Sequence, residues 1–190
     1  MIIGLSGYAQ SGKDTVAGML IGLHGYESRA FAEPMRTALY KLNPIVLEDG
    51  TRLQPIIDEF GWEHAKKHTD TRRLLQVLGT DIGREMFGEN FWVFQAIKDL
   101  HPTQDIVFTD VRFPNEAEMV RKGMGEVWRI NRPGYVPVNS HPSESALDDW
   151  RFDRYIDNDS DLDTLKDRVN ANIESARTVF EDVKRVNGWS

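Results

Sequence analysis

A glycine-rich segment near the start of the chain carries the clearest chemical pattern in the sequence. It reads GYAQSGKDT over residues 7–15, with Gly7 followed by four residues and then by the pair Gly12 and Lys13. In a loop of this kind, successive backbone N–H groups hold phosphate oxygens, and the positive end of the following helix adds to the attraction. A lysine at this position brings a mobile positive charge to the β- and γ-phosphates. The spacing therefore predicts a loop that binds a nucleoside triphosphate.

Position 14 departs from the usual pattern, which has a serine or threonine whose hydroxyl contacts magnesium. This chain has Asp14, followed by Thr15. A carboxylate is also a hard oxygen ligand for Mg²⁺, but an acidic residue in the first turn also stabilises a helix N-terminus. Both interpretations stay open, and both are compatible with ATP. The residues expected to contact ATP in this loop are Gly7, Gln10, Ser11, Gly12, Lys13, Asp14 and Thr15.

A second carboxylate follows a short apolar run, DIVFTD, over residues 105–110. Asp110 is expected at the carboxyl end of a buried strand, which is where ligands bind in parallel α/β sheets. There it would anchor the water ligands of Mg²⁺ or orient Arg112, or else cap the helix that begins near Pro114. Asp14 and Asp110 are the predicted metal ligands.

Short apolar runs alternate with helical patterns along the chain, and this order is typical of a parallel sheet with helices on both faces. The sequence therefore predicts a three-layer α/β/α fold. In the last segment, apolar residues from Leu162 to Val186 recur at steps of three and four, which predicts one long amphipathic helix packed on the body. The expected strands lie near residues 2–5, 27–31, 105–110, 126–132 and 154–158, and the expected helices span 13–23, 32–42, 55–67, 72–86, 90–100 and 114–122.

Composition excludes several classes of function. The 190 residues are 40% hydrophobic, include no cysteine and carry a formal net charge of −7. Disulfides, thiolate zinc sites and cysteine nucleophiles are therefore excluded, and a surface that coats nucleic acid is disfavoured. No run approaches the roughly 20 apolar residues of a membrane span, and no secretory signal is evident. We expect a cytoplasmic protein without nucleic-acid or membrane partners.

Four segments together resemble a known family. SGKDT (11–15), FAEPMRTAL (31–39), LLQVLGTDIGREMFGENFWV (74–93) and TDVRFPNEAEMV (109–120) are similar to the bacteriophage deoxynucleoside monophosphate kinases of the P-loop nucleoside monophosphate kinase superfamily. The resemblance implies a single P-loop kinase domain over residues 1–190, with a helical acceptor-binding region at about 32–100 and a lid loop at about 132–150. It also implies transfer of the γ-phosphoryl group of ATP, with Mg²⁺, to a deoxynucleotide, and it is compatible with a homodimer in the cytoplasm of a host cell.

Two other functions share the loop. A dephospho-coenzyme A kinase or another small-metabolite kinase would keep the loop and change the acceptor. A nucleotide-dependent switch or motor subunit is disfavoured, because neither an arginine-rich oligomer interface nor a basic nucleic-acid face stands out in the sequence.

The family resemblance implies roles for basic and polar residues in several segments. Phosphoryl transfer to a group that is already anionic needs positioning and charge neutralisation more than a base, and the planar fork of arginine suits phosphate. Arg36, Arg72 and Arg112 are the predicted contacts of the acceptor phosphate. The predicted catalytic residues are Lys13, Asp110, Arg112 and Arg132. The predicted substrate-binding residues are Phe31, Arg36, Arg72, Arg73, Gln76, Gly79, Thr80, Arg84, Trp92, Asp110 and Arg112.

Alternatives remain for some of these residues. Arg72, Arg73 and Arg84 also fit a solvated helix face, and Trp92 fits either a wall of the base pocket or the core. Asn158 is expected to approach the adenine. Arg132 and the loop through His141, Ser143 and Glu144 are expected to form the lid, although their composition also fits a plain surface loop.

Two further patterns mimic metal sites. His64 and His68 have the spacing of helical zinc ligands, but Ala65 stands where the metalloprotease motif has glutamate, and a third ligand is missing. The stretch DNDSDLD from Asp157 begins like a calcium loop but has Leu162 where glycine is required. Neither segment is expected to bind a metal.

Overall fold

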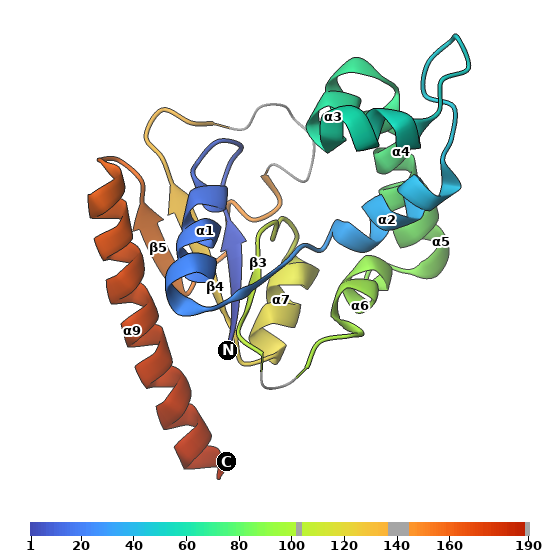
Figure 1. Ribbon diagram of the computed structural model, residues 1–190. Helices are drawn as coiled ribbons and strands as arrows, with labels where there is room; N and C mark the ends of the chain where they lie inside the picture. The colour runs from blue at the N-terminus through green and yellow to red at the C-terminus, as the bar shows by residue number, and fades with distance from the viewer. Residues whose placement is uncertain (102–103, 137–144, 189–190) are drawn as a thin grey trace. The chain divides into compact units, whose positions relative to one another are not determined.

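The computed structural model describes residues 1–101, 104–136 and 145–188. The chain divides into two compact units (Figure 1). The first, here called the sheet unit, comprises Met1–Ala30 and Leu100–Ser190, and the second, here called the helical unit, comprises Phe31–Asp99. The helical unit spans almost the range expected for the acceptor-binding region, and that role stays a prediction.

The sheet unit is built on a five-stranded sheet in the order β2-β3-β1-β4-β5, with every described pair of strands parallel. In β1, β3 and β4 the central residues are buried and, apart from Arg129 of β4, apolar. The residues of β2 are exposed, and β5 buries only Ile156. Connections that return to the same sheet edge through a helix make such strands parallel. The predicted parallel sheet is confirmed. Its strands are β1 (Ile2–Ser6), β2 (Glu27–Arg29), β3 (Ile106–Phe108), β4 (Glu126–Asn131) and β5 (Arg154–Asp157).

Helices cover both faces of this sheet. Ile3 and Leu5 of β1 lie in one buried cluster with residues of α1 (Lys13–His24) and α9 (Leu162–Asn187). Gly4 points to the opposite face, where a Cβ atom would lie 2.7 Å from Val111 and 3.1 Å from Val120. Val120 belongs to α7 (Pro114–Lys122). Because successive strand side chains alternate in direction, α1 and α9 cover one face and α7 the other, which confirms the α/β/α layering.

Only the middle of α9 is buried. Leu165 and Ile173 are at most 2% exposed, whereas Leu162 and Val186 are 63% and 82% exposed. The prediction that the whole apolar stripe packs on the body is wrong at both ends. The helix has 26 residues and is about 39 Å long at 1.5 Å per residue. The longest strand has six residues and spans about 20 Å. The helix therefore extends beyond the sheet that it covers.

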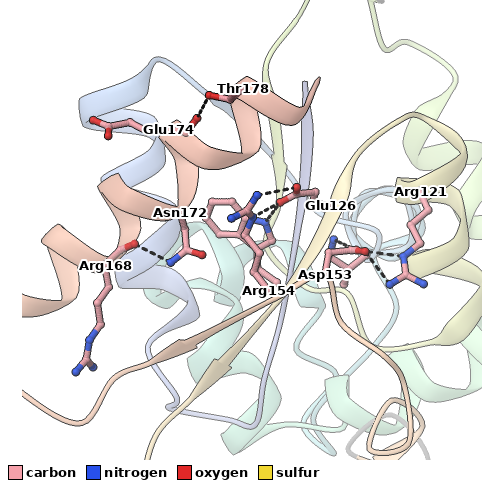
Figure 2. A network of polar contacts seen from close by, with 10 residues as sticks. Arg121, Glu126, Asp153, Arg154, Arg168, Asn172, Glu174 and Thr178 are labelled. Carbon is pink, nitrogen blue, oxygen red and sulfur yellow. Dashed lines mark hydrogen bonds and ion pairs between the residues drawn. The ribbon is translucent and has the colours of Figure 1, made fainter. Parts of the chain in front are cut away.

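Ion pairs hold the amino-terminal ends of β4 and β5 together. Arg154 contacts the Glu126 carboxylate at 2.5 and 3.1 Å, and Asp153 accepts a hydrogen bond from Arg121 of α7 at 2.9 Å (Figure 2). The side chains of Arg154 and Glu126 are less than one-fifth exposed, so this pair is screened less than a surface pair. The network lies at the opposite edge of the sheet from the glycine loop and has a structural role.

The helical unit packs around a separate apolar cluster that includes Leu39, Leu53 and Leu75. The segment between its first two helices forms an isolated antiparallel bridge from Ile45 to Arg52, which encloses the turn dipeptide Asp49-Gly50. Two expected helices differ from a plain α-helix. Within 72–86, residues Val77–Arg84 are wound as a π-helix, and the helix expected over 55–67 is kinked at Gly61, whose φ of 79° is non-helical. The helices of this unit are α2 (Glu33–Leu42), α3 (Leu53–His68), α4 (Thr71–Gln76), η1 (Val77–Arg84), α5 (Glu85–Phe87) and α6 (Phe91–Ile97).

Across the described ranges of the chain, no helix combines the length and the apolar character that crossing a membrane requires.

Because α9 is buried only in its middle, the same Val→Ala substitution should lower the free energy of unfolding by different amounts at different positions of this helix. Val169→Ala removes two buried methyl groups at a position that is 0% exposed, and we expect it to lower the free energy of unfolding by about 2 kcal/mol. Val186→Ala, at 82% exposure, should change it by less than about 0.5 kcal/mol. Urea denaturation of both variants provides the comparison, and equal costs would contradict the burial seen here.

Candidate functional site

The loop between β1 and α1 has the backbone geometry that its glycines allow. Gly7, Gln10 and Gly12 have φ angles of 151°, 63° and 104°. A Cβ at Gly7 would lie 2.6 Å from the backbone oxygen of Ile130, and one at Gly12 would lie 2.4 Å from the side-chain nitrogen of Asn158. Both positions therefore need glycine, because the backbone conformation and the close neighbours each exclude a side chain.

The Lys13 side chain folds back over this loop. Its ammonium group donates hydrogen bonds to the carbonyl oxygens of Gly7 at 2.7 Å and Tyr8 at 2.8 Å. These acceptors are neutral, and phosphate oxygens would offer stronger charge-assisted hydrogen bonds. The lysine is thus held at the loop by contacts that an anionic ligand can replace.

Asn158, predicted to approach the adenine, and Arg132, predicted to be catalytic and part of the lid, both reach the loop from neighbouring strand ends. The Asn158 amide, just after β5, donates to the Ser11 carbonyl at 2.9 Å. The Arg132 guanidinium, just after β4, donates to the Gln10 carbonyl at 3.2 Å and lies 4.7 Å from the centre of the Tyr135 ring. The structure therefore brings both side chains to the glycine loop.

A pocket of about 200 Å³ lies beside the loop. The Ser11 hydroxyl, which belongs to its lining, is buried and has no hydrogen-bond partner among the described residues. A buried hydroxyl without a partner is uncommon and costs free energy, so a ligand group or water in the pocket would satisfy it. The lining consists of Tyr8, Ser11, Ile130, Asn131, Arg132, Pro133, Tyr135, Asp157 and Asp159.

Sequence reasoning missed a polar cluster that supports the same loop. The Tyr8 hydroxyl donates to Asp148 at 2.8 Å, and the Arg129 guanidinium lies 4.4 Å over the Tyr8 ring and 3.4 Å from Asp148. Burial, followed by the hydrogen bond and the charge of Asp148, raises the pKa of the Tyr8 phenol. The signal in the sequence is an arginine that interrupts the apolar run of an expected strand. In the structure this residue, Arg129, is just 9% exposed.

The predicted metal ligands are on two elements. Asp14 and Thr15 are both exposed in the first turn of α1. Gly4 of β1 pairs with Phe108 of β3, so Asp110, two residues further on, lies level with the end of β1. The described residues contain no group of three or more histidine, aspartate or glutamate side chains arranged to hold a metal ion. Mg²⁺ usually keeps several waters and binds one or two carboxylates together with substrate phosphates, and these two carboxylates fit that role.

Glu116 caps the start of α7. Its carboxylate accepts hydrogen bonds from the backbone N–H groups of Arg112 at 2.8 Å and Phe113 at 3.1 Å, and the residue is only 6% exposed. This cap fixes the backbone of the segment that carries Arg112 directly after the β3 end.

Two of the predicted acceptor arginines influence the same carboxyl group in the helical unit. The pKa of the Glu63 carboxyl lies below its ordinary value, first because Lys66 donates a hydrogen bond to it and also because the charges of Lys66, Arg36 and Arg72 lie nearby. The charges of Arg36 and Arg72 thus both act on one acidic residue of α3. Arg73 differs, because Asp70 holds its guanidinium through hydrogen bonds of 2.9 and 3.0 Å.

The other predicted residues of this unit are distributed along η1 and its neighbours. Gln76 and Thr80 are exposed, Arg84 is half-buried, and Phe31 is buried. The Trp92 indole N–H donates to the Gly79 carbonyl at 3.0 Å. The expected lid residues His141, Ser143 and Glu144 lie outside the described residues.

Comparison with known families matches residues 51–169 to the family described as deoxynucleotide monophosphate kinase. A protein of Acanthamoeba polyphaga mimivirus, named as a putative deoxynucleotide monophosphate kinase, is 32% identical over 165 residues, which are 77% of this chain and 82% of that protein. The chain belongs to the deoxynucleotide monophosphate kinase family. The resemblance drawn from the four motifs is confirmed, and the protein is a kinase of the phosphotransferase class.

Matches to phage members of the family are shorter. The deoxynucleoside-5′-monophosphate kinase of Escherichia phage T5 is 41% identical over 86 residues, which are 40% of this chain and 34% of that protein. The enzyme of Escherichia phage RB69 is 30% identical over 103 residues, which are 52% of this chain and 42% of that protein. The chain thus aligns with less than half the length of these two relatives.

Among solved structures, the dephospho-CoA kinase from Campylobacter jejuni aligns over 92% of this chain and 96% of that chain, at 14% identity and a TM-score of 0.45. At this identity and TM-score, the similarity gives no information about which molecule accepts the phosphoryl group. The match to the deoxynucleotide family does not favour the dephospho-coenzyme A alternative.

The contact of Asn158 with the glycine loop makes a testable prediction. Asn158→Ala removes the hydrogen bond to the Ser11 carbonyl and the packing against Gly12, and we expect the dissociation constant of ATP to rise about tenfold, the equivalent of one lost hydrogen bond. Isothermal titration calorimetry measures it.

The matched control is Asn172→Ala. The Asn172 amide also donates to a backbone carbonyl, that of Arg168 in α9, at 2.8 Å (Figure 2), but it lies away from the loop. ATP affinity should be unchanged in this control, and wild-type affinity in both variants would contradict the role of Asn158.

Proposed function

We propose that the protein transfers the γ-phosphoryl group of ATP to the 5′-phosphate of a deoxynucleoside monophosphate, giving ADP and a deoxynucleoside diphosphate. The observation that carries the proposal is the phosphate-binding loop geometry of residues 7–13 in a chain of the deoxynucleotide monophosphate kinase family. An oxygen of the acceptor phosphate forms the new bond to the γ-phosphorus, and the bond to the β–γ bridging oxygen breaks.

The glycine loop supplies most of the electrostatic stabilisation in this proposal. Its backbone N–H groups and the start of α1 hold the β- and γ-phosphates, and Lys13 exchanges its two carbonyl contacts for phosphate oxygens. The acceptor oxygen is already anionic, so no side chain has to remove a proton. Catalysis then consists of alignment and charge neutralisation.

Mg²⁺, when bound with ATP, neutralises charge that develops on the phosphate oxygens. Asp14 or Thr15 at the start of α1 and Asp110 after β3 would hold it, through water or directly. Two carboxylates and one hydroxyl are all oxygen donors, as a hard cation requires.

Arg36 and Arg72 would bind the acceptor phosphate within the helical unit. Guanidinium groups bind phosphate oxygens in pairs. Gln76, Thr80 and Arg84, which lie on one continuous helical stretch, would contact the base.

The pocket beside the loop would take the adenine of ATP, since Arg132 and Asn158 already border the loop there. Free nucleotides and Mg²⁺ would be the only ligands required for turnover, without a nucleic-acid or membrane partner. A lid around residues 132–150, a homodimer and a site of action in the host cytoplasm are further parts of the proposal, and they rest on the family resemblance.

A coupled ADP-release assay with a panel of deoxynucleotides, ribonucleotides and dephospho-coenzyme A tests the acceptor class. We expect turnover with at least one deoxynucleoside monophosphate and none with dephospho-coenzyme A. Lys13→Ala should lower kcat by about 10³-fold, because it removes a preorganised positive charge from the transferred phosphate. Circular dichroism should show an intact fold, and a fully active Lys13→Ala enzyme would refute the role of the loop.

The choice between Asp14 and Thr15 as the magnesium residue can be settled by two isosteric variants. If Asp14 holds the metal, Asp14→Asn should raise the Mg²⁺ concentration for half-maximal rate by about tenfold, while Thr15→Val should leave it nearly unchanged. Magnesium titrations of kcat provide the measurement. The opposite ranking would assign the metal contact to the Thr15 hydroxyl and leave Asp14 as a charge at the helix N-terminus.

A further inference from the structure

The π-helix η1 is built against one indole ring. We propose that Trp92 is a positioning residue, which fixes the π-wound segment Val77–Arg84 and thereby aims Thr80 and Arg84 at the deoxynucleotide. The inference rests on the proposed function, because it assigns a task to side chains that bind the acceptor nucleotide in that function.

The contact between Trp92 and η1 is polar as well as apolar. The indole Nε1–H donates to the backbone carbonyl of Gly79 at 3.0 Å. An indole N–H that is withdrawn from water requires such a partner, so this bond fixes the orientation of the ring relative to the helix backbone. Trp92 is on α6, so the bond also ties η1 to a second helix.

Gly83 allows the ring to lie directly on the helix. A Cβ at this position would lie 2.0 Å from Nε1, 2.6 Å from Cε2 and 2.9 Å from Cδ1 of Trp92. Gly83 is buried and its φ angle is not among the positive ones, so close approach, and not a special backbone conformation, requires glycine here. Any other side chain would push the indole away from the Gly79 carbonyl.

The other glycine of η1 makes a second close contact. A Cβ at Gly79 would lie 2.8 Å from the sulfur of Met35 on α2. The segment is therefore held between α2 and the indole, with a glycine at each contact. π-helical turns are rare and occur mostly at functional sites, so a segment of this kind needs specific contacts of the type seen here.

The Trp92 ring is itself fixed by aromatic neighbours. Phe91 meets it edge-to-face with ring centroids 4.8 Å apart, and Phe87 stacks on Phe91 at 5.0 Å. Thr80 is exposed while Gly83 is buried against the indole. Gly79 and Gly83 thus contact Met35 and Trp92, while Thr80 is exposed on the same segment. A shift of the indole would therefore move the groups that are proposed to contact the base.

Trp92→Phe tests this role, because it keeps an aromatic ring and removes only the indole N–H and part of the ring. We expect the KM for deoxynucleoside monophosphates to rise about tenfold, the equivalent of one lost hydrogen bond. The rise should be the same for purine and pyrimidine acceptors, while the KM for ATP should not change. Hydrogen exchange of the amides of residues 77–85 should become faster. Gly83→Ala should reproduce all of these effects.

The controls are Trp62→Phe, which alters another tryptophan packed in the helical unit, and Gly22→Ala, at a helical glycine with open space around it. Both should retain wild-type KM values and exchange rates over 77–85. Equal effects in Trp62→Phe and Trp92→Phe would overturn the proposal, because they would indicate general packing.

Two further outcomes would also overturn it. A rise in KM in Trp92→Phe that is confined to purine or to pyrimidine acceptors would indicate that the indole stacks directly on the substrate base. Unchanged amide hydrogen exchange over residues 77–85 would show that the indole does not hold η1. A wild-type enzyme that fails to phosphorylate any deoxynucleotide would instead refute the proposed function. The two failures are distinguishable, since hydrogen exchange needs no turnover.

Discussion

Parallel pairing of β1 with both of its neighbours is the constraint on which the sheet unit's site depends. Because β1 lies between β3 and β4, the carboxyl ends of these strands reach the same edge of the sheet. The glycine loop follows β1, Asp110 follows β3, and Arg132 and Asn158 follow β4 and β5. Residues far apart in sequence thus come to the same edge of the sheet as the loop, which is where ligands bind in open α/β sheets.

The loop also depends on contacts that hold its open shape before a phosphate arrives. Its carbonyls face Lys13, Arg132 and Asn158, while Tyr8 is fixed by Asp148 and Arg129. Within the loop, the Ser11 N–H also donates a hydrogen bond to the Tyr8 carbonyl at 3.2 Å. A loop that is already ordered loses less conformational entropy on binding, which favours affinity.

The sequence predicted the elements governed by local chemistry and missed those governed by close packing. The helix Pro114–Lys122 was predicted with its observed bounds, because Pro114 and Gly123 mark its ends. The π-winding of η1 could not be foreseen, since it depends on how Trp92 meets Gly79 and Gly83. Likewise the exposure of Val186 follows from the length of the sheet, which the periodicity of the helix does not reveal.

The arginines of the helical unit show why residue type alone left their roles open. Arg72 and Arg73 are adjacent and chemically identical, yet Arg73 is engaged by Asp70 whereas Arg72 joins Arg36 near Glu63. Clustered positive charges repel one another, and a nearby carboxylate offsets part of that repulsion while no anion is bound. Glu63 is 87% exposed on its side chain and is paired with Lys66, so solvent screens the charge that it offers to Arg36 and Arg72. In the proposed function, the acceptor phosphate would be a stronger, doubly charged partner for these guanidinium groups.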